Sequence, residues 1–197
     1  ALQCTGTAGQ EWKIIAPATN AVASWVGIVA DSKILNAEIG KVFLWGKVQA
    51  DCLGHASLAA NVFLEVINRK AFDGTIGNCA FVAGSGTTRD TITDSDNGLV
   101  TDGFLPGHRI VIAGSTSNDG SYEIYSVAAG TITLTTIGGV TSETAAGTIV
   151  ALGYMQYDGA ADTANSPAVA REAYTTTTTI AKKWVQLQGV QKVIAAS

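Results

Sequence analysis

Residues 85–152 alternate between short β-prone segments and strong turn signals, and no other feature of the chain restricts its fold as much. Two of these segments change side-chain character with a period of two, as strands with two different faces do. Helix caps and a 3.6-residue period are absent. Five segments at this spacing predict a small antiparallel barrel or sandwich. They are Thr91–Thr93, Arg109–Ile112, Ser121–Val127, Thr131–Thr135 and Thr148–Leu152.

The turns and the strand faces of this region can also be assigned. Asn118-Asp119-Gly120 is a strong hairpin signal, which predicts that the segments on either side of it pair. The alternation in 121–127 predicts two faces. One face takes Tyr122, Ile124 and Ser126, and the other takes Glu123, Tyr125 and Val127.

Charge separates this region from the rest of the chain. Residues 85–152 carry seven acidic residues and two arginines, a net charge of −5, whereas the flanks carry nine acidic and ten basic residues. This asymmetry predicts an acidic module, 85–152, inserted into a domain that 1–84 and 153–197 form together. Residues 84–88 are expected to be a linker, and residues 153–172 a loop or return linker.

The flanks also hold strand candidates, chiefly Lys41–Ala50 and Ala59–Asn68, with Trp184–Gln188 near the end of the chain. Ala30–Glu38 is the one short helix candidate. Each flank has too few strands to close a sheet alone, so we expect the flanks to pair across the insertion into one antiparallel β-sandwich. The predicted fold class is mainly β.

Residues 88–152 resemble a small β-module found in structural proteins of tailed bacteriophages. The resemblance covers about a third of the chain, and His108 stands where the pattern often carries an acid. It brings no catalytic residue with it. The matching points are Asp102-Gly103-Phe104, Gly107, Ile110, Ile112, Gly114, Asn118-Asp119-Gly120, Tyr122, Ile124, Val127, Ile132 and Leu134.

This resemblance implies a non-enzymatic virion structural protein, placed most readily in the phage head. A capsid decoration (cement) protein is the first expectation, and a head–tail connector or tail protein is the next. Its partners would be copies of itself and the major capsid protein or another virion protein. Two alternatives from other classes stay open: a secreted β-sandwich that binds carbohydrate or acts as an adhesin, and, ranked last, a small β-rich hydrolase.

Composition favours a protein that packs against neighbours. Charged residues make up only 14 % of the chain and apolar residues 47 %, so much of the surface is either covered or weakly charged. All four tryptophans lie in the flanks, and Trp is enriched at interface hot spots. Core packing is the ordinary explanation for such residues, an assembly interface is the sharper hypothesis that we carry forward, and a sugar-binding platform is a third; the residues are Trp12, Trp25, Trp45 and Trp184.

No catalytic residue, cofactor site or metal site is expected. His55 and His108 do not lie in nucleophile elbows, which predicts turn or interface histidines. Asp94-x-Asp96-x-Gly98 approaches a calcium loop but lacks its Glu at the twelfth position. The segment 84–88 lacks the Lys of a phosphate-binding loop.

The cysteines, the basic residues and the apolar runs argue against metal, nucleic-acid and membrane partners. Cys4, Cys52 and Cys79 form no CxxC pair, so buried free thiols are expected, with one disulfide as the alternative. The chain has no run of Lys and Arg, which argues against a nucleic-acid partner. No apolar run reaches membrane-spanning length, so no membrane partner is expected.

Overall fold

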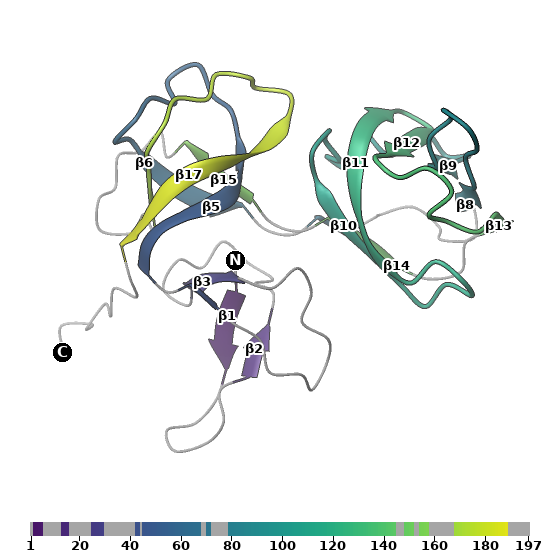
Figure 1. The fold of residues 1–197 in the computed structure, drawn as a ribbon, viewed down its shortest axis with the longest axis horizontal. Coiled ribbons are helices and arrows are strands. Elements are labelled where there is room, and N and C mark those ends of the chain that lie inside the picture. Colours follow the sequence, from purple (N-terminus) through teal and green to yellow (C-terminus); the bar gives the residue numbers. More distant parts are fainter. Residues whose placement is uncertain are drawn as a thin grey trace. The chain divides into compact units, whose positions relative to one another are not determined.

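The chain is mainly β, and it forms two compact units in a computed structural model (Figure 1). None of the described residues is helical, so none belongs to a membrane-spanning helix. The first unit is made of residues 1–68, 153–177 and 181–197, and the second of 69–152 and 178–180. The structure describes residues 2–5, 13–15, 25–29, 42–43, 45–67, 70–71, 79–144, 148–151, 154–157 and 168–188. The expected helix at Ala30–Glu38 lies outside these residues.

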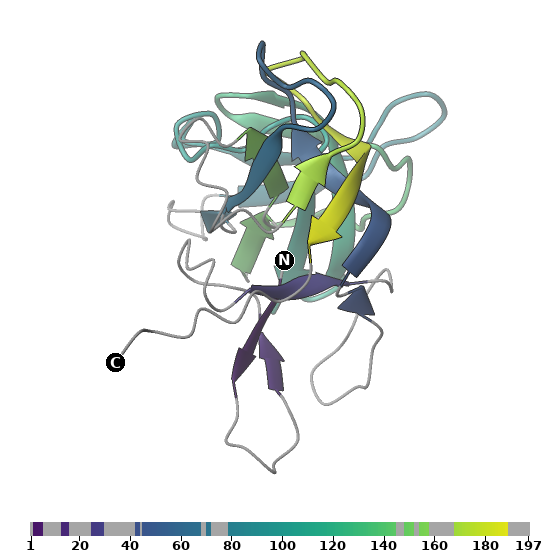
Figure 2. The ribbon, with the colours of Figure 1, turned by 90° about the vertical axis from the view of Figure 1, so that its left-hand side faces the viewer.

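The first unit contains a four-stranded sheet and a closed five-stranded barrel (Figures 1 and 2). The sheet has the order β2-β1-β3-β4. Its strands are β1 (Leu2–Thr5), β2 (Lys13–Ile15), β3 (Trp25–Val29) and β4 (Val42–Phe43). The barrel has the order β15-β5-β17-β16-β6. Its strands are β5 (Trp45–Leu53), β6 (Phe63–Ile67), β15 (Tyr154–Tyr157), β16 (Ala168–Ala170) and β17 (Ile180–Gln188).

The barrel interior is filled by small and medium apolar side chains. Strand β5 alternates, so that Val48, Ala50 and Cys52 are buried while the residues between them are more exposed. Strand β15 runs parallel to β5 and antiparallel to β6. The core consists of Val48, Ala50, Cys52, Leu58, Leu64, Met155, Ala168, Ala170, Val185 and Leu187. Interior side chains of this size suit a barrel with few strands.

Two expectations about the flanks need correction. Residues 153–172 are not only a return linker, because β15 and β16 come from this segment and complete the barrel. Lys41–Ala50 is not one strand either, since β4 pairs with β3 while β5 belongs to the barrel. Strands of two to four residues carry almost no periodic signal, so only their backbone pairing identifies them.

The second unit is an eight-stranded antiparallel sheet with the order β13-β8-β9-β12-β11-β10-β14-β7. Its strands are β7 (Lys70–Ala71), β8 (Cys79–Val82), β9 (Thr91–Asp94), β10 (Arg109–Ala113), β11 (Gly120–Ala128), β12 (Thr131–Leu134), β13 (Glu143–Thr144) and β14 (Thr148–Ala151). Strands β13 and β14 follow each other in the chain but lie near opposite ends of this order. Four residues reach at most about 14 Å, so the sheet must curl back on itself.

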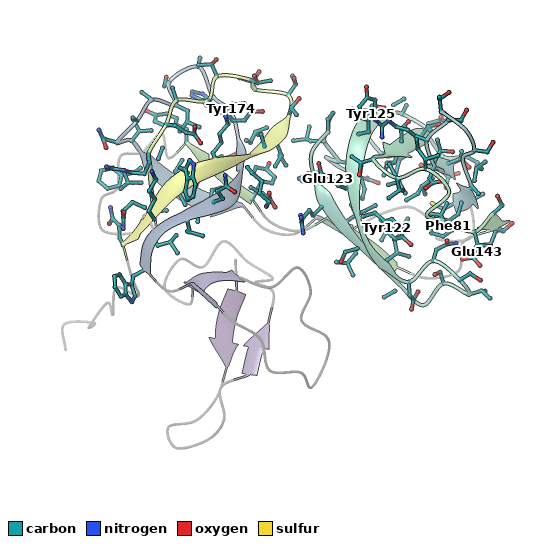
Figure 3. All side chains as sticks on the ribbon, in the orientation of Figure 1. Phe81, Tyr122, Glu123, Tyr125, Glu143 and Tyr174 are labelled. Carbon is teal, nitrogen blue, oxygen red and sulfur yellow. The ribbon has the colours of Figure 1, made fainter. Side chains whose placement is uncertain are left out.

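A β-bulge in β11 changes the predicted assignment of faces. The pairing with β12 shifts register between Ile124 and Ser126, so one extra residue lies opposite β12. After this shift Val127 packs against the same core as Tyr122. Tyr125 is exposed, and Figure 3 labels it together with Tyr122. The expectation that Val127 shares a face with Tyr125 is therefore wrong. A strict period of two holds only where no residue is inserted.

The points that carry the phage-module resemblance are positions that specify this fold. Phe104, Ile110, Ile112, Ile124, Ile132 and Leu134 are all in the buried core of the second unit. Gly103, Gly107 and Gly114 have φ values of 84°, 81° and 81°, a region that favours glycine. The pattern therefore describes core and turns, and it points to no reactive group.

Asp90 is a buried carboxylate that holds two loops of the second unit together. Its Oδ1 accepts the N–H groups of Gly84 at 2.7 Å and Gly138 at 2.8 Å, and its Oδ2 accepts that of Gly139 at 2.8 Å. Burial works to raise the pKa of Asp90, but these hydrogen bonds outweigh it and keep the pKa below its ordinary value. Residues 84–88 are thus not a linker. They form the turn between the paired strands β8 and β9, within which Thr88 N–H donates to Ser85 O.

Asn118 performs a similar task at the β10–β11 turn. Its side chain is fully buried, donating to Thr141 O at 2.9 Å and to Glu143 Oε1 at 2.6 Å. In return, its Oδ1 accepts the N–H of Thr141 at 2.7 Å. The predicted β10–β11 hairpin is confirmed, and its Asn also ties the turn to the segment that leads into β13.

Candidate functional site

An exposed aromatic face lies on two neighbouring strands of the barrel, β5 and β17. On β5 the outward positions are Trp45, Lys47 and Gln49, and all three are exposed. On β17 the buried Val185 and Leu187 alternate with outward residues. Figures 1 and 2 show β17, in yellow, beside β5, in blue. We define the aromatic face as Trp45, Lys47, Gln49, Asp51, Lys182, Trp184 and Gln188.

The two tryptophans of this face are turned toward water. The exposed fraction is 78 % for Trp45 and 41 % for Trp184, although Trp is among the residues that usually bury most of their surface. Core packing is therefore excluded for both. Trp25 begins β3, but its side chain lies outside the described residues, as does the whole of Trp12. The structure thus places two of the four predicted interface residues on neighbouring strands of the barrel, both exposed.

Trp184 is held in place by its neighbours. Lys47 Nζ lies 4.9 Å from the centroid of the Trp184 ring, a cation–π contact worth about 0.5–1 kcal/mol at an exposed site. The backbone N–H of Trp184 donates to Glu172 Oε1 at 2.7 Å, and its carbonyl accepts the N–H of Arg171 at 2.9 Å. The ring is therefore exposed, while Lys47 covers part of one ring face and the backbone beneath it is hydrogen-bonded.

The charges of the aromatic face are few and largely matched. Lys182 Nζ lies 2.6 Å from Asp51 Oδ1 and joins β17 to β5. Such exposed pairs contribute at most about 1 kcal/mol. Of the three charged residues of the aromatic face, only Lys47 lies outside this ion pair. A face with two exposed indoles, amides and one such cation suits contact with another surface better than it suits chemistry.

The two histidines have structural hydrogen bonds. Ser57 N–H donates to His55 Nδ1 at 3.1 Å, and the His55 ring stacks on Tyr157 with centroids 4.8 Å apart. Leu105 N–H donates to His108 Nδ1 at 2.9 Å, and His108 is buried. Both rings therefore accept a backbone N–H group through Nδ1 within a turn, which agrees with the first of the two roles that the sequence predicts, a turn or an interface histidine.

The Asp-rich turn uses its first carboxylate for its own backbone. Asp94 Oδ1 accepts the N–H of Asp96 at 3.0 Å, and Asp94 Oδ2 accepts that of Gly98 at 2.8 Å. These oxygens are committed to the turn, as is common for Asp. Across the part of the chain that the structure describes, no group of three or more His, Cys, Asp or Glu could hold a metal ion.

Cys52 and Cys79, the two cysteines whose side chains are described, are buried and free, as the sequence predicts. Burial is the main cause that raises the pKa of Cys52 to about 12 and that of Cys79 to about 11. Such thiols are poor nucleophiles at neutral pH, because the thiolate is the reactive form. Cys4 lies in β1, and its side chain is outside the described residues.

Sequence reasoning found the tryptophans of the face but missed the residues that order it. Lys47, Glu172 and Arg171 give no motif: β5 brings Lys47 to Trp184 from a distant part of the sequence, and the pairing of β16 with β17 brings Arg171 and Glu172 there. No protein-family model, curated protein or solved structure matches this chain.

Proposed function

We propose that this chain is a non-enzymatic structural protein of a tailed-phage virion. Its first role would be capsid decoration, in which it packs against copies of itself and the major capsid protein of the head. The observation that carries this proposal is the pair of exposed tryptophans on β5 and β17, of which Trp184 is contacted by Lys47. Ordered aromatic residues are the common anchors of protein interfaces, because little side-chain freedom is lost when they bind.

Two further features support a packing role. The phage-module resemblance lies in the second unit, where its apolar points form the core and its glycines the turns. The low charge of the chain suits a surface that neighbours cover. A head–tail connector or tail protein would use the same properties, and binding to isolated heads, tails and connectors separates these roles.

The experiment compares association of the wild-type chain with that of Trp45→Ala and Trp184→Ala. Sedimentation velocity gives self-association, and co-sedimentation with phage heads that lack the chain gives binding. Loss of a hot-spot residue of about 2 kcal/mol should weaken the affected contact about 30-fold. Tyr125→Ala is the matched control, because Tyr125 is an exposed aromatic residue (56 %) of the other unit.

Two outcomes would contradict the proposal or its placement of the interface. If the wild-type chain stays monomeric at every concentration and binds no virion part, the proposal fails. If Tyr125→Ala weakens association as much as Trp184→Ala does, the aromatic face is not the interface.

A carbohydrate-binding role is the second candidate, and one observation favours it. Exposed Gln49 and Gln188 flank the tryptophans on the same outward positions, and amides can both donate to and accept from sugar hydroxyl groups. The apolar faces of sugar rings stack on exposed indoles. Titration with a glycan panel would shift Trp fluorescence if this role were correct, and Trp184→Ala would abolish the shift.

We also propose that the two flanks form a β-sandwich. The sheet β2-β1-β3-β4 would form one layer and strands of the barrel the other, at the usual spacing of about 10 Å between packed sheets. Amide hydrogen exchange tests this, because packing would protect one face of β1 and β3. Uniformly fast exchange in these strands would argue against a sandwich.

A further inference from the structure

Asn97-Gly98 is the only Asn-Gly pair in the sequence, and it lies in the turn that follows β9. Asn followed by Gly is the dipeptide most prone to deamidation, since glycine has no side chain to hinder ring closure. Asn97 is exposed and has a φ of 60°, a left-handed conformation that few residues other than Gly and Asn adopt.

The reaction needs only the chain and water. The backbone nitrogen of Gly98, having given up its proton, attacks Cγ of Asn97 and forms a C–N bond. The Asn97 side-chain nitrogen takes up a proton and leaves as ammonia, which yields a succinimide. Water then opens the ring at either carbonyl and gives aspartate or isoaspartate at position 97.

The structure places an obstacle at the first step. Gly98 N–H donates to Asp94 Oδ2 at 2.8 Å, and Asp94 is buried. Attack requires this hydrogen bond to break and a negatively charged nitrogen to form beside a carboxylate, which Coulomb repulsion disfavours. A hydrogen bond to a charged acceptor in a buried site is also among the stronger ones.

The Asn97 side chain is held as well. Its Nδ2 donates to Ser95 O at 3.2 Å, and its Oδ1 lies against Gly130, where a Cβ would collide with it. Asp94 N–H donates to Gly130 O and Leu99 N–H to Ala129 O, both of which fix this turn on the β11–β12 turn. Cγ of Asn97 is therefore kept from swinging freely toward Gly98 N.

We propose that Asn97 is a latent deamidation site whose reaction is suppressed in the folded chain by the Asp94 carboxylate. The modification adds a negative charge beside Asp94 and Asp96. Isoaspartate also lengthens the backbone by one methylene group, which breaks the register of the 94–98 turn. The reaction would thus mark chains in which this turn has opened.

The test is peptide mapping by mass spectrometry after incubation at pH 8, which detects the one-dalton gain at position 97 and separates aspartate from isoaspartate. The wild-type chain is incubated folded and in guanidinium chloride. Asp94→Asn and Asp90→Asn are incubated folded. Asp90→Asn is the matched control, because among the described residues of the second unit it removes the other buried carboxylate without touching the 94–98 turn.

We expect the folded wild type to react much more slowly than the denatured chain. Asp94→Asn should raise the folded rate about tenfold, in line with the loss of one hydrogen bond to a charged group, while Asp90→Asn leaves it near wild type. Equal rates in folded and denatured wild type would overturn the proposal even if neither variant folds. Equal acceleration in both variants would also overturn it, since general loosening would then be the cause.

Discussion

Lys47 lies over the indole of Trp184, with its Nζ 4.9 Å from the ring centroid, and so joins two neighbouring barrel strands across their outer surface. The contact leaves the indole 41 % exposed while limiting its motion. An exposed aromatic ring that is already ordered loses little entropy when a partner covers it. This relationship is the physical basis for the proposal of an interface on the barrel.

Coupling between these two side chains should be measurable in the free protein. In a double-mutant cycle with Lys47→Met and Trp184→Leu, we expect a coupling of about 0.5–1 kcal/mol in the free energy of unfolding. Methionine keeps most of the apolar stem of Lys47 and removes its charge. Urea unfolding followed by circular dichroism gives the four values. A coupling of zero would mean that the contact contributes nothing in solution.

Asp90→Asn should destabilise the second unit by about 2–3 kcal/mol, because an amide cannot accept all three backbone N–H groups that the carboxylate accepts. Urea unfolding measures the loss. Glu123→Gln is the control, since Glu123 is an exposed acid of the same unit and its loss should change stability by no more than about 0.5 kcal/mol. Equal effects of the two substitutions would refute the role given to Asp90.

The lowered pKa of Asp90 predicts how the stability of the second unit depends on pH. Because the pKa of Asp90 is lowered on folding, the unfolded chain binds its proton first as the pH falls. The stability from Asp90 is therefore present above its unfolded pKa, near 4, and is lost as the pH falls through the folded value. Wild type should lose more stability than Asp90→Asn between pH 5 and pH 2, as followed by urea midpoints. Parallel curves would contradict this.

Two glycines of the second unit should respond differently to alanine. A Cβ at Gly84 would collide with the carbonyl oxygen of Thr88, whereas at Gly120 its nearest neighbour would be a Tyr122 ring atom at 3.5 Å. Gly84→Ala should therefore cost about 1–3 kcal/mol, and Gly120→Ala should stay within about 1 kcal/mol of wild type. Thermal unfolding distinguishes them. A tolerated Gly84→Ala would mean that the β8–β9 turn adapts easily.

The buried thiols should resist alkylation until the chain unfolds. With pKa values raised to about 12 for Cys52 and about 11 for Cys79, iodoacetamide at pH 8 should label neither in the folded protein. In guanidinium chloride both should react, and mass spectrometry separates them from Cys4. Since these pKa values fall on unfolding, stability should also decrease as the pH rises above about 8.5. Rapid labelling of folded protein would show that the thiols are accessible.

Sequence patterns succeed in this chain where a strand is long enough to repeat. The strands Arg109–Ala113 and Thr131–Leu134 were predictable because Ile110, Ile112, Ile132 and Leu134 alternate with more exposed residues. The β10–β11 hairpin followed from its turn residues alone. Strands β13 and β15 were not predictable, because two to four residues without a marked alternation resemble a loop until a partner strand pairs with them.

The sequence alone predicts that this chain is mainly β, identifies five of the six strands that lie in residues 91–151, and places the tryptophans outside that region. Local turn chemistry and period-two alternation are enough for that. Three properties follow from tertiary contacts alone: the flanks close a barrel, Val127 faces inward after a bulge, and Asp90 and Asn118 are buried. Tertiary contacts also set the exposure of Trp45 and Trp184 and the position of Lys47 over the Trp184 ring. These properties depend on contacts between segments that are far apart in the sequence. No local sequence pattern specifies which of those segments pair.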